Sequence, residues 1–168
     1  MDLYLFDFDN TLVQTPYPDS IYYMDRKESL NDFRWEFKIN VEVKSYYDKA
    51  KKNNNNRIVL LSNRVREVET PLRELLSRLG YEFDEYLLIE GGERSKAKRL
   101  LDYLEIIEEV ENIYYWEDKD KHIKDISENI PERNPQSIII NYPHIIKLIH
   151  HITYIITNQL MITGYHFR

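Results

Sequence analysis

The chain has no cysteine, which excludes disulfide bonds and thiolate metal ligands. Its first residues, MDLYLFDF, have neither the positively charged region nor the small-residue cleavage site of a secretory signal. Together these absences predict an intracellular, cytoplasmic protein.

Excess positive charge and a long apolar run are also missing. The 168 residues carry a formal net charge of −6, so any contact with nucleic acid must come from a local basic patch. The most apolar segment, Ile145 to Ile162, is interrupted by Lys147, two histidines and two amides. It predicts no membrane span, and the sequence does not indicate the oligomeric state.

Basic residues are absent from Met1 to Tyr23, although two carboxylates, Asp7 and Asp9, follow an apolar run there. Side chains alternate along a strand, so both acids are expected on the same side. Two close carboxylates repel each other unless a cation or a shared proton lies between them. Mg²⁺ is the natural cation, since it takes carboxylate oxygens together with water and substrate phosphate. By itself the run also fits a strand that ends in a solvated turn.

Short apolar runs alternate with helical patterns along the rest of the chain. This order predicts an α/β fold, a Rossmann-like three-layer sandwich around a mainly parallel five-stranded sheet. The expected strands are Leu3 to Phe8, Arg57 to Ser62, Tyr86 to Ile89, Asn112 to Trp116 and Ser137 to Tyr142. Helices are expected over Val41 to Lys52, from Thr70 to Gly80, over Ser95 to Ile107 and from Ile145 onward.

Polar residues end three of these strands, and the carboxyl ends of parallel strands meet at one edge of a sheet. Asp7 and Asp9 end the first, Ser62 to Arg64 end the second, and Glu117 and Asp118 end the fourth. Carboxylates, a hydroxyl and a nearby lysine together are typical of phosphoryl transfer.

Each member of this set has an expected role. Asp7 would be the nucleophile that forms an aspartyl-phosphate, and Asp9 the general acid and base. Asp118, with Asp7 and the backbone carbonyl of Asp9, would hold Mg²⁺. Ser62 would donate a hydrogen bond to the phosphoryl group, and Lys96 or Lys98 would link that group to Asp7.

The neighbouring residues have less specific expectations. Thr11 would fix the loop by hydrogen bonds to the backbone or to Asp9, or would touch substrate. Asn63 and Arg64 are candidate substrate-binding residues, although an arginine at a strand end also fits a surface ion pair. Glu117 is expected to point away from Asp118 and to support it. Asp120 and His122 would lie behind the metal ligands, and no histidine pattern indicates zinc.

These segments resemble the four motifs of the haloacid dehalogenase-like (HAD) superfamily: FDFDNTLV, LLSNR, a lysine-headed helix and YYWEDKDKH, in this order. The resemblance covers about Leu3 to His122 and implies a Rossmann-like core and a Mg²⁺-dependent phosphatase. It places the nucleophile on Asp7, the acid and base on Asp9, the hydroxyl on Ser62 and the last metal ligand on Asp118.

Several of the same segments also resemble the HAD domain of Swiss-Army-knife RNA-repair proteins. That family's spacing favours Lys98 over Lys96 as the phosphate-binding lysine. The chain has Ser62, Asn63 and Arg64 where the subfamily tends to show TGR. The resemblance implies nucleic-acid ends such as 3′-phosphates as substrate, for which the cluster Arg94, Lys96, Lys98 and Arg99 is the first basic patch to test.

The expected domain organisation is a HAD-like core over residues 1–143, with a minimal cap-like insertion at 14–39, and a helical extension over 144–168. HAD enzymes select substrates through such insertions, and a small one implies an open site suited to a large phosphorylated molecule. The alternatives are a protein, nucleotide or small-molecule phosphatase, and a non-catalytic module that binds metal or a partner.

Overall fold

A parallel sheet of five strands forms the centre of the molecule, in a computed structural model that describes residues 1–15, 37–107, 110–130 and 138–141. The strands are β1 (Asp2–Phe6), β4 (Arg57–Val65), β5 (Glu85–Ile89), β6 (Asn112–Trp116) and β7 (Ile138–Asn141). Their order is β5-β4-β1-β6-β7, and every neighbouring pair is parallel. The predicted α/β fold with its five-stranded sheet is confirmed.

The central strands are buried on both faces, which explains why they read as continuous apolar runs. In β1, Leu3 and Leu5 belong to one hydrophobic cluster and Phe6 belongs to another on the opposite face. In β4, Val59 faces the side of Leu5, whereas Leu60 faces the side of Phe6. This alternation with a period of two fixes the register of the strands, because a slip by one residue would exchange the two faces.

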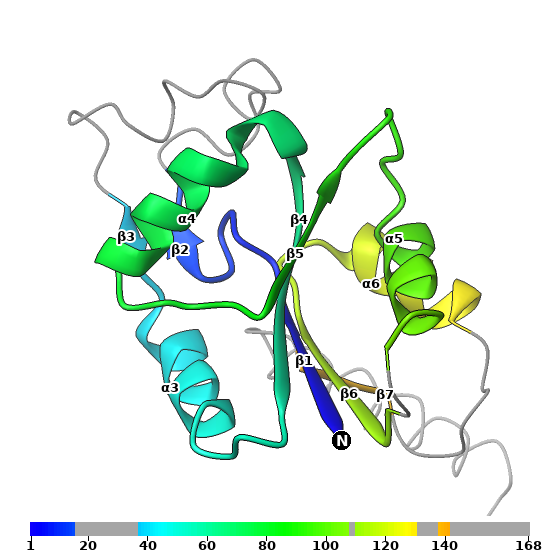
Figure 1. The fold of residues 1–168 in the computed structure, drawn as a ribbon, viewed down its shortest axis with the longest axis horizontal. Helices are drawn as coiled ribbons and strands as arrows, with labels where there is room; N and C mark the ends of the chain where they lie inside the picture. Colours follow the sequence, from blue (N-terminus) through cyan, green and yellow to red (C-terminus); the bar gives the residue numbers. More distant parts are fainter. Residues whose placement is uncertain (16–36, 108–109, 131–137, 142–168) are drawn as a thin grey trace, which may run out of the picture.

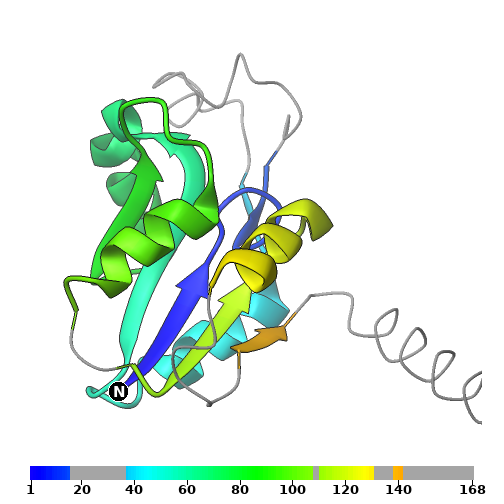
Figure 2. The same ribbon diagram turned by 90° about the vertical axis from the view of Figure 1, so that its right-hand side faces the viewer.

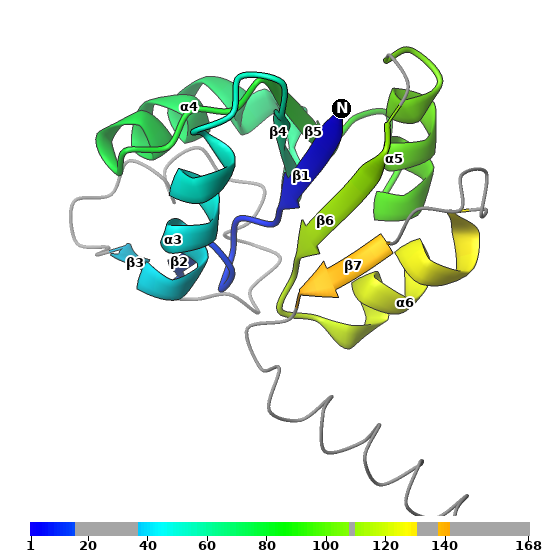
Figure 3. The same ribbon diagram turned by 90° about the horizontal axis from the view of Figure 1, so that it is seen from below.

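Helices cover both faces of the sheet and complete the three layers (Figure 1). One face carries α3 (Val41–Ala50) and α4 (Glu69–Arg78), which follows the short 3-10 helix η1 (Arg66–Val68). The other face carries α5 (Lys96–Leu104) and α6 (Asp120–Asn129), which lie side by side across it (Figures 2 and 3). Helix α6 was not predicted, although Ile123, Ile126 and Ile130 recur at helical spacing.

The start of α5 is fixed by two side chains, and this matters for the site. The Ser95 Oγ accepts a hydrogen bond from the backbone N–H of Lys98 at 3.0 Å, which is the contact of a helix N-cap. From α6, the Asp125 carboxylate accepts hydrogen bonds from the Ser95 hydroxyl at 3.1 Å and from the Ala97 N–H at 3.3 Å. These contacts hold the first turn of α5 against α6 and fix the rotation of α5 about its own axis.

A small antiparallel hairpin joins β2 (Val13–Gln14) to β3 (Lys38–Ile39), with Val13 opposite Ile39. The expected cap-like insertion at 14–39 begins and ends at this hairpin, but its residues 16–36 lie outside the described residues, as does the extension at 144–168. Between β4 and β5 the chain forms only η1 and α4, with no added domain. None of the described helices is long and apolar enough to cross a membrane.

Candidate active site

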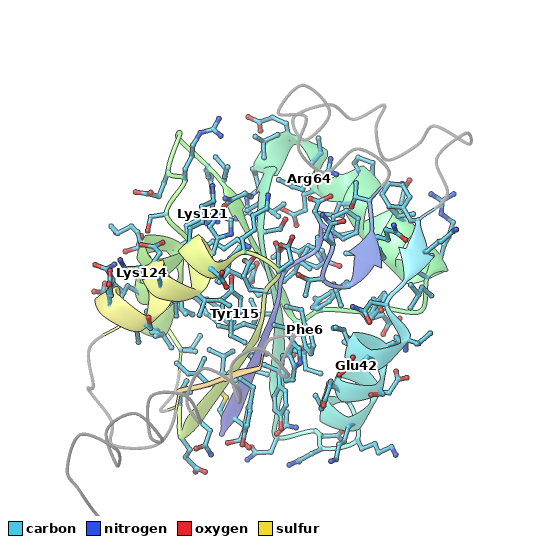
Figure 4. The ribbon with its side chains drawn as sticks, turned by 180° about the vertical axis from the view of Figure 1, so that it is seen from behind. Phe6, Glu42, Arg64, Tyr115, Lys121 and Lys124 are labelled. Carbon is cyan, nitrogen blue, oxygen red and sulfur yellow. The ribbon has the colours of Figure 1, made fainter. Side chains whose placement is uncertain are left out.

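The candidate site lies at the carboxyl ends of β1, β4 and β6. Figure 4 shows Arg64 and Lys121 at this end of the sheet, beyond Phe6 and Tyr115, which lie within it. Because the three strands are parallel neighbours in the sheet, the polar residues that follow them are brought together here. The predicted convergence of three distant segments is therefore present.

Strand β1 ends at Phe6, two residues before the predicted end, so Asp7 already lies in the turn that follows. The Asp7 N–H donates to the Trp116 carbonyl at 3.0 Å, which ties this turn to the end of β6. Asn10 has a φ of 59°, in the left-handed region that asparagine tolerates better than most residues. The chain turns sharply here, so strand alternation does not govern the directions of Asp7 and Asp9.

Asp7 is 5% exposed and is paired with a lysine from α5. The Lys96 Nζ lies 2.7 Å from the Asp7 Oδ1 and 2.5 Å from the Glu117 Oε2. The Lys96 side chain is only 1% exposed, so it is a buried cation shared by two carboxylates. Burial opposes its charge, but Asp7 and Glu117 outweigh that effect and raise the lysine pKa.

The lysine beside Asp7 is thus Lys96, whereas Lys98, which the family spacing favoured as the phosphate-binding lysine, lies elsewhere. Lys98 is 54% exposed and pairs with Asp102 on the solvent side of α5. Two positions along a helix correspond to a rotation of about 200°, so the two lysines point in nearly opposite directions. Lys96 lies one helical turn before the buried Leu100. This spacing in the sequence indicates that position 96 is on the buried side of the helix.

Glu117 is fully buried, and the expectation that it points away from Asp118 is wrong, because carboxylate oxygens of the two residues lie within 4.8 Å of each other. Besides Lys96, its Oε2 accepts a hydrogen bond from the Tyr115 hydroxyl at 2.6 Å and lies 3.1 Å from the His122 Nδ1. Its Oε1 accepts from the Lys119 N–H at 3.0 Å. Burial opposes ionisation, but Lys96 and His122 bring the pKa of Glu117 well below its usual value.

Asp7, Glu117 and Asp118 each offer a carboxylate oxygen, and these oxygens lie within 4.8 Å of one another. Burial, followed by Glu117, raises the pKa of Asp7 to about 8 and that of Asp118 to about 7. Close, buried carboxylates resist carrying a full negative charge each, and a divalent cation relieves that repulsion. A donor set of carboxylate oxygens suits Mg²⁺, so the three residues fit the expected metal. Glu117 was not among the predicted ligands, and the Asp9 side chain is not in this group.

Asp9 is instead held by an arginine on the neighbouring strand. The Arg64 Nε donates to the Asp9 Oδ2 at 2.9 Å, and the Arg64 Nη2 donates to the Oδ1 at 2.7 Å. Arg64 is 1% exposed, so the expected substrate-binding arginine forms a buried pair with Asp9. The Thr15 hydroxyl adds a third hydrogen bond to the Oδ1 at 2.6 Å.

Thr11 was expected to bond to the backbone or to Asp9. The hydroxyl that contacts Asp9 belongs instead to Thr15, which was not predicted. Thr11 is fully buried, and its hydroxyl has no hydrogen-bond partner among the described residues. No sequence pattern distinguishes the two threonines, because the path of the turn decides which hydroxyl reaches Asp9.

The second strand end contributes two further polar side chains. Ser62 is 1% exposed, and its Oγ accepts a hydrogen bond from the Arg64 N–H at 3.4 Å. The Asn63 Oδ1 accepts from the Arg99 Nη2 at 2.7 Å, and the Asn63 Nδ2 lies 3.4 Å from the His122 Nε2. Asn63 thus connects β4 to both α5 and α6 beside the acidic group.

Comparisons with known proteins concern the fold. No family model and no curated protein matches the chain. Among solved structures, the HAD domain of the effector protein Lem4 from Legionella pneumophila matches with a TM-score of 0.54 and 14% identity, over 94% of each chain. The fold is haloacid dehalogenase-like.

Two further structures support the same HAD-like fold. A chain of the Pnkp1/Rnl/Hen1 RNA repair complex matches with a TM-score of 0.57 and 17% identity, over 84% of this chain and 43% of the other. A second structure of the Pnkp1/Rnl/Hen1 complex gives the same TM-score and identity over 73% and 40%. The present chain therefore spans less than half the length of those two relatives.

Proposed function

We propose that the protein is a Mg²⁺-dependent phosphomonoester hydrolase that acts through an aspartyl-phosphate on Asp7. The observation that carries this proposal is the buried pairing of Asp7 with Lys96 at 2.7 Å, next to the carboxylates of Glu117 and Asp118. The lysine contacts the Oδ1 of Asp7 and shields its charge; the other oxygen, Oδ2, is the one that we assign to the attack. A carboxylate in this setting suits attack on a phosphoryl group whose own negative charge is neutralised.

In the first step, the Oδ2 of Asp7 forms a bond to phosphorus while the bond from phosphorus to the leaving oxygen breaks. Asp9 supplies the proton that the leaving oxygen needs. In the second step, Asp9 takes a proton from water as the water oxygen attacks phosphorus and the bond to Asp7 breaks. Mg²⁺ bound by Asp7 and Asp118 would neutralise charge on the phosphoryl oxygens.

The contacts of Asp9 are compatible with this role. A carboxylate has about four acceptor positions, and Arg64 and Thr15 occupy three of them. Among the described residues no donor occupies the fourth position, which we assign to the leaving oxygen or the attacking water. We infer that Arg64 orients Asp9 and does not grip the substrate, whereas Ser62 and Lys96 are the groups that would contact the phosphoryl oxygens.

For the substrate class, we propose phosphorylated nucleic-acid ends. Support comes from the likeness to a chain of an RNA repair complex and from the absence of an added cap domain between β4 and β5. Lys121 at the start of α6 and Arg94 before α5 are both exposed on elements that border the site. They supply local positive charge on an otherwise acidic protein.

Hydrolysis of an aryl phosphate tests the chemistry. We expect turnover that requires Mg²⁺ and disappears in Asp7→Asn, while Asp102→Asn on the exposed side of α5 keeps the wild-type rate. Trapping of a covalent phosphate on the wild type, but not on Asp7→Asn, would identify the nucleophile. Wild-type protein that binds Mg²⁺ but hydrolyses no phosphomonoester would refute the proposal and favour a binding module.

A substrate panel tests the class. Oligonucleotides with a 3′-phosphate are expected to have a higher kcat/KM than phosphopeptides, free nucleotides and sugar phosphates. This preference should weaken as salt is raised, because contacts with the nucleic-acid backbone release counterions. Equal kcat/KM values across the panel would refute the preference and leave a general phosphatase.

A further inference from the structure

Arg99, on the first turn of α5, is a buried cation that the proposed mechanism does not use. The residue is 8% exposed and therefore largely removed from water. Its Nη1 donates to the Glu93 carbonyl at 3.1 Å, and its Nη2 donates to the Asn63 Oδ1 at 2.7 Å. Its Nε is buried and has no hydrogen-bond partner among the described residues.

The partners of Arg99 are neutral, which distinguishes it from the other buried cations of the site. Lys96 and Arg64 each contact carboxylates directly, whereas Arg99 forms no ion pair within the part of the chain that the structure describes. Burial lowers its pKa, with Glu93 and Asp7 acting on it only as charges. A buried charge without an ion-pair partner costs free energy, so an anion at the free Nε would stabilise this arrangement.

The location of Arg99 indicates which anion is suitable. It lies one helical turn after Lys96 and bonds to Asn63, the neighbour of Ser62. Lys96 and Ser62 are the two residues proposed to contact the phosphoryl group. The charge of Asp7, the proposed nucleophile, also acts on Arg99. An oxyanion at Arg99 would therefore lie near the substrate phosphate, and a guanidinium is well suited to bind phosphate oxygens.

We propose that Arg99 is a phosphate-binding residue, whose Nε donates to an oxygen of a substrate phosphate. This assignment rests on the proposed function, which identifies the substrate. Binding of inorganic phosphate tests the role of Arg99 separately, because it needs no turnover. Two sources provide the same chemistry: the phosphoryl group that reacts, and an adjacent phosphodiester of a nucleic-acid end.

A purely structural role is the competing explanation, in which Arg99 fixes the segment before α5 through Glu93 and joins it to Asn63. The two explanations predict different effects of Arg99→Met, which keeps the length of the side chain but removes its charge. Loss of the hydrogen bonds to Glu93 and Asn63 lowers stability under either explanation, but only a phosphate-binding residue also weakens phosphate binding when it is replaced. A structural residue lowers stability and leaves phosphate affinity unchanged.

The experiment measures binding of inorganic phosphate by calorimetry with Mg²⁺ present, and melting temperature with and without phosphate. We expect Arg99→Met to raise the phosphate Kd by about tenfold or more, as for loss of a charge-assisted hydrogen bond. Arg78→Met, which removes an exposed arginine at the end of α4, is the matched control and should keep the wild-type Kd. If Arg99→Met does not fold, Arg99→Lys supplies the test, since it keeps the charge but not the planar fork.

Steady-state kinetics then separate the two sources. A higher KM for both an aryl phosphate and a phosphorylated oligonucleotide places Arg99 on the reacting group, whereas a higher KM for the oligonucleotide alone places it on the neighbouring phosphodiester. Phosphate affinity equal to that of wild type in both Arg99 variants would overturn the assignment. Wild-type protein that binds phosphate through Arg99 yet hydrolyses nothing would refute the proposed function and leave this inference intact.

Discussion

Replacement of Lys96 by methionine is the most direct perturbation of the candidate site. Lys96 contacts Asp7 and Glu117 at 2.7 and 2.5 Å, and all three side chains are at least nine-tenths buried. Removing one partner of a buried ion pair costs about 3–5 kcal/mol of unfolding free energy, because an uncompensated buried charge remains. For a domain of this size, about 3 °C of melting temperature corresponds to each kcal/mol, so we expect a fall of about 9–15 °C.

Thermal unfolding in metal-free buffer and aryl phosphate hydrolysis are the assays, with Lys98→Met as the matched control two positions along the same helix. Lys98 pairs with Asp102 in solvent, so its replacement should leave both the melting temperature and the activity at wild-type values. Lys96→Met should lose measurable turnover. Addition of Mg²⁺ should recover part of its stability, because a cation then compensates the carboxylates again.

Equal melting temperatures for Lys96→Met and Lys98→Met would refute the inference that the buried lysine compensates the acidic group. Turnover retained in Lys96→Met but lost in Lys98→Met would restore Lys98 as the phosphate-binding lysine. A stability loss in Lys96→Met that Glu117→Gln does not reduce in the double variant would show that the two side chains are not energetically coupled.

Three further predictions follow from the same structure. The pKa of Asp7 is raised from its usual 3.8 to about 8, so metal-free wild-type protein loses stability as the pH rises between these values. The melting temperature of Asp7→Asn, measured relative to wild type, should therefore increase from pH 5 to pH 9. A difference that stays constant over this range would contradict the raised pKa. Arg64→Met should lower unfolding free energy by about 3–5 kcal/mol, and adding Asp9→Asn should recover part of it; strictly additive losses in denaturant titrations would argue against the pair. Asn40→Ala removes the cap that accepts from the Val43 N–H, so stability should fall by about 1 kcal/mol at unchanged kcat; a change in kcat would show that α3 affects the site.

The sequence alone was sufficient to predict the sheet and the identity of the acidic strand ends. Apolar runs such as those of β4 and β6 indicate strands buried on both faces, and parallel strands must bring their carboxyl ends to one edge. The positions of Asp7 and Asp118 follow from that rule without any knowledge of side-chain contacts. Helix α6 was missed because its apolar residues are few, although their spacing is regular.

Contacts inside the site were decided by the tertiary structure, because they depend on rotation and on turn geometry that local sequence does not specify. Ser95 and Asp125 set where α5 begins, and a helix rotates by about 100° per residue, so this start turns Lys96 inward and Lys98 to solvent. The turn at Asn10 brings Thr15 to Asp9 in place of Thr11. Charge pairing across strands and helices could be recognised only when these elements had been packed together.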